Sequence, residues 1–215
     1  MRIYAAADIH ARPDRIQRVT EAVAALRPDL LVLAGDICQY RRPAEMLDRL
    51  NALGLPVLAV RGNSDPKRVE SMGAVGRRIT FLHLRTTTVG GVPFVGVGGT
   101  ALLPFSSRIA WRAHAAARQL ARRITPETVL VTHPPPYGIL DGVLGRFHAG
   151  CRVLRRTIDA HPPRLVLCGH IHEQPGVVEL AHTTVVNCTL GRGGGALVEL
   201  RPGGRPRVEV MKLEI

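Results

Sequence analysis

Five short apolar runs in this chain end in polar side chains, and this arrangement constrains the fold more than any other feature. The runs read YAAAD, LLVLAGD, VLAVRGN, VLVTH and LVLCGH. Continuously apolar runs such as LLVLAG and LVLCG are typical of strands that are buried on both faces. Ligands of α/β proteins gather outside the carboxyl ends of such strands. The pattern therefore predicts an α/β protein with a functional site at the strand ends.

The remaining periodicity extends this prediction to the whole chain. Strands are expected at 3–8, 30–35, 56–61, 79–84, 92–97, 128–132, 165–168, 177–180, 183–187, 196–200 and 208–213, and helices at 13–26, 44–53, 66–72, 107–124 and 151–160. The second half is richer in strands than in helices, which favours a mixed sheet or two packed sheets over a Rossmann winding. Without an internal repeat or a linker, residues 1–215 are expected to form a single domain.

Composition excludes several classes of protein. The chain is 46% hydrophobic and 21% charged, and it contains no apolar run of the ~18 to 20 residues that a membrane-spanning helix needs. Its start, MRIYAAAD, reads as a strand and not as a signal peptide, so a cytoplasmic location is expected. The four cysteines include no C-x-x-C pair, which argues against a zinc knuckle or a disulfide framework.

The charge balance leaves two interpretations open. Lys plus Arg total 29 against 17 acidic residues, and Lys67 and Lys212 are the only lysines. A net charge of +12 would suit an anionic partner such as nucleic acid. The arginines are dispersed, however, and only 4% of residues are aromatic, so stacking surfaces for bases are scarce. Dispersed surface arginines are the favoured interpretation. Self-association into a homo-oligomer is also allowed.

Seven side chains with oxygen or nitrogen donors follow the five runs. They are Asp8, His10, Asp36, Asn63, His133, His170 and His172. Because side chains alternate along an extended chain, Asp8 and His10 should point to the same side and share one ion. Imidazole, carboxylate and amide groups suit Mn, Fe, Ni or Zn better than a soft-metal thiolate site. The strand ends therefore predict a metal centre.

Each of these short motifs occurs by chance, but their ordered combination is specific. Asp-x-His, Gly-Asp, Gly-Asn-x-Asp, a strand-terminal His and Gly-His-x-His follow one another over residues 1 to about 200. In this order they resemble the calcineurin-like metallophosphoesterase superfamily. The resemblance implies a four-layer αββα sandwich of two mixed sheets flanked by helices, and a phosphoester hydrolase that activates water with two metal ions.

The resemblance also assigns roles to the seven side chains. Asp8, His10 and His172 would bind one metal, Asn63, His133 and His170 the second, and Asp36 both. Two Mn²⁺ ions are the favoured pair, with Fe, Ni, Zn or Co as alternatives. Asn63 would also have a catalytic role. Asp65 would either anchor the loop that carries Asn63, without contacting the metal, or cap a helix that starts at Pro66.

Two positions depart from the superfamily pattern. Many members carry a histidine where this chain has Ser64, and a serine cannot act as a general acid near neutral pH. Members with a small residue there resemble simple bacterial and archaeal phosphodiesterases. The other departure is Ala11-Arg12, where Gly-Asn is common; Arg12 is either a phosphate contact or an exposed turn residue.

A cytosolic phosphodiesterase for small or nucleotide-like diesters is the favoured function, with Ser64 and Arg12 as candidate substrate contacts. A nuclease or a phosphomonoesterase is the alternative. A non-catalytic scaffold, such as a retromer subunit of the same fold, is disfavoured because all seven ligand positions are intact. His114 is a candidate replacement acid, the segment 98–104 a candidate rim loop, and His148 a helix-start residue. The role of Asn187 stays open because Cys-Thr-Leu follows it where many members have Pro-Gly-Ser.

Overall fold

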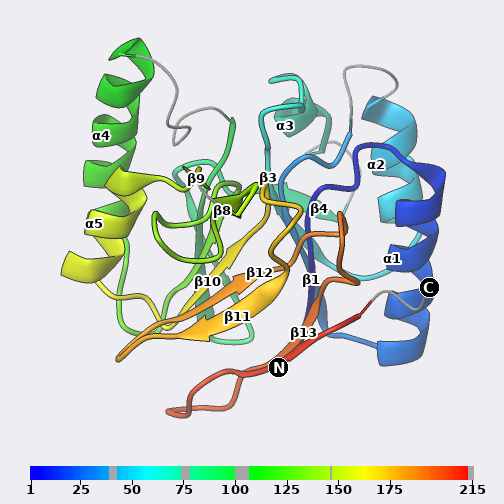
Figure 1. Ribbon diagram of the computed structural model, residues 1–215. Coiled ribbons are helices and arrows are strands. Elements are labelled where there is room, and N and C mark those ends of the chain that lie inside the picture. Colours follow the sequence, from blue (N-terminus) through cyan, green and yellow to red (C-terminus); the bar gives the residue numbers. More distant parts are fainter. Residues whose placement is uncertain (39–42, 74–77, 100–106, 146, 213–215) are drawn as a thin grey trace.

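Two mixed six-stranded sheets form the centre of the computed structural model, which describes residues 1–38, 43–73, 78–99, 107–145 and 147–212 (Figure 1). The first sheet has the order β14-β13-β1-β2-β3-β4. Its strands are β1 (Arg2–Ala6), β2 (Leu30–Ala34), β3 (Val57–Val60), β4 (Ile79–Phe81), β13 (Ala196–Glu199) and β14 (Arg207–Val210). Strands β1 to β4 run parallel, and β13 pairs antiparallel with both β1 and β14.

The second sheet has the order β11-β12-β10-β7-β6-β5. Its strands are β5 (Thr86–Val89), β6 (Val92–Val97), β7 (Val129–Thr132), β10 (Leu165–Cys168), β11 (Gly176–Glu179) and β12 (Thr184–Asn187). The four central strands are parallel, and the edge strands β5 and β11 are antiparallel to their neighbours. A separate two-stranded hairpin, β8 (Gly142–Val143) with β9 (Phe147–His148), lies outside both sheets.

Three hydrophobic clusters define four layers. One cluster packs the two sheets together, through Ile3 and Val32 of the first and Phe94 and Leu167 of the second. The other two clusters join the outer face of each sheet to its helices. Helices α1 (Pro13–Leu26), α2 (Pro43–Asn51) and α3 (Val69–Gly73) belong to the first sheet, and α4 (Ser107–Ala121) and α5 (Arg152–Ala160) to the second (Figure 1). The predicted αββα sandwich of two mixed sheets is confirmed.

Local sequence explains where most elements begin and end. Pro13 occupies the first turn of α1, where its missing N–H costs nothing. The amide of Leu154 donates to the Cys151 thiol at the start of α5. The predicted start of the third helix was wrong, because the helix begins at Val69 and not at Pro66. Strand β5 was not predicted, because its TTTV sequence alternates half-buried and exposed positions at a sheet edge. Within the described residues, no helix has the length and hydropathy needed to cross a bilayer.

Candidate metal centre

The carboxyl ends of five parallel strands from both sheets meet at one place. Chain segments after β1, β2 and β3 supply it from the first sheet, and segments after β7 and β10 from the second. The two sheets are joined here by hydrogen bonds from the amide of Ala7 to the carbonyl of Cys188 and from the amide of Leu190 to the carbonyl of Ala7. The strand ends therefore bring predicted donors from the first sheet next to predicted donors from the second sheet.

One group of donors combines Asp8, His10 and His172. One ligand atom from each lies within 4.8 Å of the others. His172 Nε2 is 3.5 Å from Asp8 Oδ1, and the rings of His10 and His172 meet edge to face with centroids 5.5 Å apart. Asp8 is fully buried, while the two imidazoles are partly exposed. This group contains the three residues that were predicted to share one ion.

A second group is centred on Asp36 and His133. Their nearest atoms, Asp36 Oδ2 and His133 Nε2, are 3.5 Å apart, and Asp8 also lies within 4.8 Å of both. His133 Nε2 contacts Asn63 Oδ1 at 3.0 Å and His170 Nδ1 at 3.2 Å. All seven predicted donors are therefore brought together, and the two groups share Asp8.

Burial and mutual contact set the protonation of these groups. Burial alone would raise the pKa of Asp36, but the hydrogen bond and charge of His133, together with the Ser64 amide and the charge of His10, hold that pKa well below its usual range. Burial would lower the pKa of His133, yet Asp36 raises it to about 9. Burial, followed by the nearby charge of His133, lowers the pKa of His170 to about 4. The carboxylate of Asp36 thus stabilises a positive charge on His133.

The backbone around the donors is held in an uncommon conformation. Asp8, His10, Asp36 and His170 all have positive φ, at 62°, 54°, 51° and 71°. Such angles cost energy for residues other than glycine and persist only where surrounding contacts enforce them. The amide of Asp8 donates to the carbonyl of Gly35, and the amide of His10 donates to that of Asp36. These hydrogen bonds hold the first two ligand loops against each other.

Two glycines let the loops approach the donors closely. A Cβ at Gly62 would collide with the Asp36 carboxylate, and a Cβ at Gly35 would lie 2.5 Å from His133 Nδ1. Gly35 also has a φ of 91°, which L side chains rarely adopt. His133 Nδ1 lies 2.9 Å from the carbonyl oxygen of Ala34, which requires the proton on Nδ1 and leaves Nε2 free to bind a metal.

Asp65 holds two ligand loops together from inside the protein. Its buried carboxylate accepts hydrogen bonds from the amides of Ile37 at 3.1 Å, Cys38 at 2.8 Å and Gly62 at 2.8 Å. Burial raises the pKa of Asp65. Because α3 begins at Val69, the expectation that Asp65 caps a helix starting at Pro66 is wrong. Its contacts agree with the alternative, support of the loops that carry Asp36 and Asn63.

Ser64 and Arg12 make contacts that sequence reasoning did not foresee. The Ser64 hydroxyl donates to Asp36 Oδ2 at 3.0 Å, and its amide donates to Asp36 Oδ1 at 2.8 Å. Ser64 thus orients a carboxylate of the centre. The exposed Arg12 guanidinium lies 3.0 Å from Asp14, within α1. This pairing agrees with an exposed turn arginine, and a substrate contact by either residue stays a prediction.

Two further residues support the ligands and were not assigned this role from the sequence. The buried guanidinium of Arg15 donates to the carbonyl oxygen of Asp8, and its Nε has no hydrogen-bond partner among the described atoms. Asn187 Nδ2 donates to the carbonyl of Ile171 at 2.8 Å, between His170 and His172. The position of Asn187 at a strand end was the available signal, whereas nothing local distinguishes Arg15 from other helix arginines.

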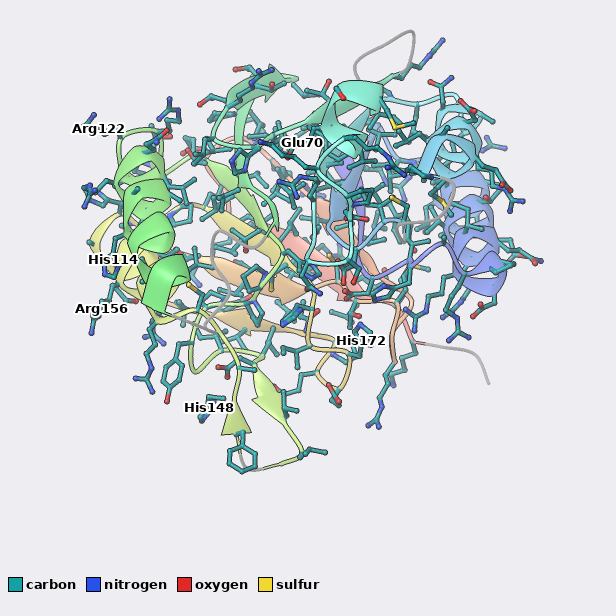
Figure 2. The ribbon with its side chains drawn as sticks, turned by 90° about the horizontal axis from the view of Figure 1, so that it is seen from above. Glu70, His114, Arg122, His148, Arg156 and His172 are labelled. Atoms are coloured by element: carbon teal, nitrogen blue, oxygen red, sulfur yellow. The ribbon has the colours of Figure 1, made fainter. Side chains whose placement is uncertain are left out.

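The other sequence candidates lie apart from the ligands. Figure 2 shows His114 on α4, on the far side of the second sheet from His172. His148 belongs to β9 and not to a helix start, and its Nδ1 lies 2.7 Å from Asp141 Oδ1. Of the expected rim loop, only Gly98 and Gly99 fall within the described residues, and positions 100–104 lie outside them.

The donor set fits divalent transition metals. Neutral imidazoles, carboxylates and one amide oxygen are borderline to hard ligands, and the buried carboxylates need positive charge beside them. The glycines leave the donors room to approach one another without intervening side chains. Thiols do not contribute, since all four cysteines are buried and absent from both donor groups.

A family model named calcineurin-like phosphoesterase matches residues 1–174. The chain therefore belongs to the calcineurin-like phosphoesterases, a family of divalent-metal-dependent hydrolases of phosphoric esters. The uncharacterized protein MJ1162 of Methanocaldococcus jannaschii is 27% identical over 196 residues, which cover 87% of each chain.

Two solved structures share the fold. A dimetal phosphatase from Danio rerio has a TM-score of 0.66 at 11% identity, with 99% of this chain and 98% of that chain covered. A structure described as a novel archaeal phosphodiesterase has a TM-score of 0.57 at 14% identity, with 98% of this chain and all of that chain covered. At these identities the likeness extends to the fold alone.

Proposed function

We propose that this protein is a phosphodiesterase that hydrolyses small or nucleotide-like diesters with two divalent transition-metal ions, Mn²⁺ first among them. Asp8, His10 and His172 would hold one ion, and Asn63, His133 and His170 would hold the other. Asp36, which contacts His10 at 3.6 Å and His133 at 3.5 Å, would serve both ions. When bound, the two cations lower the pKa of a water and stabilise charge on the phosphoryl oxygens.

The protein's own residues supply the remaining requirements of the reaction. Asp65 fixes the spacing of the loops that carry Asp36 and Asn63 through three buried amide hydrogen bonds. His133 must present Nε2 without a proton, and the carbonyl of Ala34 favours that tautomer by accepting from Nδ1. Geometry is therefore set before a substrate arrives, which lowers the cost of reaching the transition state.

The contact between Ser64 and Asp36 is the observation that carries the preference for diesters. The hydroxyl of Ser64 is engaged by the carboxylate, so position 64 offers no general acid to an alkoxide leaving group. An activated aryl diester needs little help from an acid, and it places less negative charge beside Asp8 and Asp36 than a monoester dianion does. Hydrolysis of diesters is therefore favoured over hydrolysis of monoesters.

The test is a screen of chromogenic diesters, monoesters and cyclic nucleotides with Mn²⁺, Ni²⁺, Co²⁺, Zn²⁺ and Fe²⁺. We expect the highest kcat/KM for a diester, with two equivalents of metal per chain. An active preparation free of metal would contradict the two-ion proposal. A preference for monoesters would contradict the assigned substrate class but not the proposed metal centre.

A further inference from the structure

A hollow of about 430 Å³ opens beside Asn63. It is formed by the connection between β3 and α3, and its lining includes Asn63, Asp65, Lys67 and Arg68. Asn63 thus faces both the metal centre and the hollow, because its Oδ1 contacts His133. A ligand held at the centre can extend from Asn63 directly into this space.

The charged side chains that line the hollow differ in whether they have a partner of opposite charge. The guanidinium of Arg61, which also lines it, is paired with Glu70 at 2.7 Å, and both side chains are largely covered. The Asp65 carboxylate is buried and engaged by three backbone amides. Lys67 is exposed, and none of the described acidic residues forms an ion pair with it. Its ammonium is therefore an available cation at the rim.

The hollow lies apart from the arginines beside α4 and α5. Figure 2 shows Glu70 on α3, apart from Arg122, which directly follows α4, and from Arg156 on α5.

We propose that this hollow binds a second anionic group of the substrate, with Lys67 as the residue that selects it. The inference rests on the proposed phosphodiesterase function and narrows its substrate class to diesters that carry another phosphate or a carboxylate, as nucleotide-like diesters do. Lysine binds a phosphate as a compact point charge, and a charge-assisted hydrogen bond is stronger than a neutral one. Arg61 and Glu70 compensate each other, and Arg68 is already engaged in another interaction, so the second anion is recognised chiefly by Lys67.

The scarcity of lysine provides a direct binding test with an internal control. Lys67 and Lys212 are the only lysines, and both are exposed. The Mn²⁺-loaded protein is treated with an amine-acetylating reagent in the presence of thymidine 5′-phosphate or thymidine 3′,5′-bisphosphate, and labelling of each lysine is followed by mass spectrometry. We expect the bisphosphate to slow labelling of Lys67 about tenfold more than the monophosphate does. Labelling of Lys212 should not change.

A kinetic test uses two diesters that differ by one phosphate. These are the 4-nitrophenyl esters of thymidine 5′-phosphate with a 3′-hydroxyl or a 3′-phosphate. We expect the wild type to prefer the 3′-phosphate by about tenfold in kcat/KM, mostly through KM. Lys67→Gln should bring the ratio close to one and Lys67→Glu below one, whereas Lys212→Gln should keep the wild-type ratio.

The two experiments separate failure of this inference from failure of the proposed function. If diesters are cleaved but Lys67 is neither protected nor required for the preference, the hollow does not bind the second anion. If Lys67 is protected but no diester is cleaved, the anion site stands and the phosphodiesterase assignment fails. Equal protection of Lys67 and Lys212 would mean nonspecific association with the anion and would overturn the inference.

Discussion

The metal centre and the groove between α4 and α5 both contain histidines, but the two regions differ in how far their side chains are buried and in whether carboxylates lie beside them. The groove has a volume of about 280 Å³ and is lined by His114, Arg118, Arg156 and His161, all exposed. At the centre, the imidazoles instead surround two buried carboxylates, Asp8 and Asp36, on strained backbone.

This difference shows that residue type alone does not mark a site. In the groove, the described neighbours of Arg118 and Arg156 provide no acidic partner for an ion pair, and water and salt can screen both cations. At the centre, every donor is held by a hydrogen bond or by another donor. Catalysis, which needs side chains in fixed positions, is therefore expected at the centre. The groove can provide only a weak electrostatic attraction for anions.

The largest effect should come from Asp36, the carboxylate that contacts a histidine of each donor group, His10 at 3.6 Å and His133 at 3.5 Å. We expect Asp36→Asn to lower kcat/KM on the preferred diester by about a thousandfold, because one metal-binding charge is removed while the shape of the side chain is kept. The matched change on the groove side is Asp159→Asn on α5, where the exposed Asp159 pairs with Arg155. It should stay within about twofold of wild type. Circular dichroism and metal analysis of both variants accompany the kinetics, and comparable losses in the two would break the distinction.

Metal removal should give the next largest effect. Histidine ligands must be neutral to bind a metal, so protons compete with the ions. Because Asp36 raises the pKa of His133 to about 9, affinity should fall continuously as the pH falls below about 9. We expect chelation to abolish activity and Mn²⁺ to restore it, with at least about tenfold weaker metal binding at pH 5.5 than at pH 7.5. Calorimetric titration at the two pH values measures this. A His114→Gln, His161→Gln variant of the groove should show the same pH dependence as wild type, and a changed dependence would place these histidines in the metal site.

The fold could be predicted from the sequence largely because its strands are buried on both faces. Runs such as LLVLA of β2 and LVLC of β10 are fully buried, so apolar continuity marks them clearly. The edge strand β5 lacks this signal, since only one of its faces is partly covered. Pro66 indicated a helix start, but the backbone between Asp65 and Val69 makes turns before α3 begins.

The convergence of the seven donors also follows from the sequence, because parallel strands bring their carboxyl ends to one edge. The contacts that hold these donors do not follow from it. Asp65 joins amides that are 27 and 28 residues away, and Arg15 reaches the carbonyl of Asp8 from a helix face. Positive φ at Asp8 and His170 is likewise imposed by tertiary contacts, against the local preference of these residues.

Ser64 should give a smaller effect that sharpens the chemistry of the centre. Its hydroxyl donates to Asp36, so Ser64→Ala should lower kcat/KM on diesters by about fivefold, the equivalent of one hydrogen bond. Ser64→His places an imidazole of suitable pKa at the same position. We expect it to raise the ratio of monoester to diester kcat/KM relative to both wild type and Ser64→Ala. Metal content must be equal in all three proteins. An unchanged ratio in a fully metallated Ser64→His protein would show that this position does not set the substrate class.

The groove should give the smallest effect, and only on binding. If its arginines attract nucleic acid, association should be weak and should fall steeply as salt rises, because each neutralised phosphate releases counterions. Replacing both Arg118 and Arg156 with glutamine should reduce the magnitude of the slope of log K against log salt by about two, roughly one for each arginine that is replaced. Diester hydrolysis should change by less than about twofold, since neither residue belongs to the donor groups. Fluorescence anisotropy with a single-stranded oligonucleotide between 50 and 200 mM salt measures the slope. Submicromolar affinity at physiological salt, together with strand cleavage that the two substitutions abolish, would make the groove part of a nuclease and remove the contrast between the two regions.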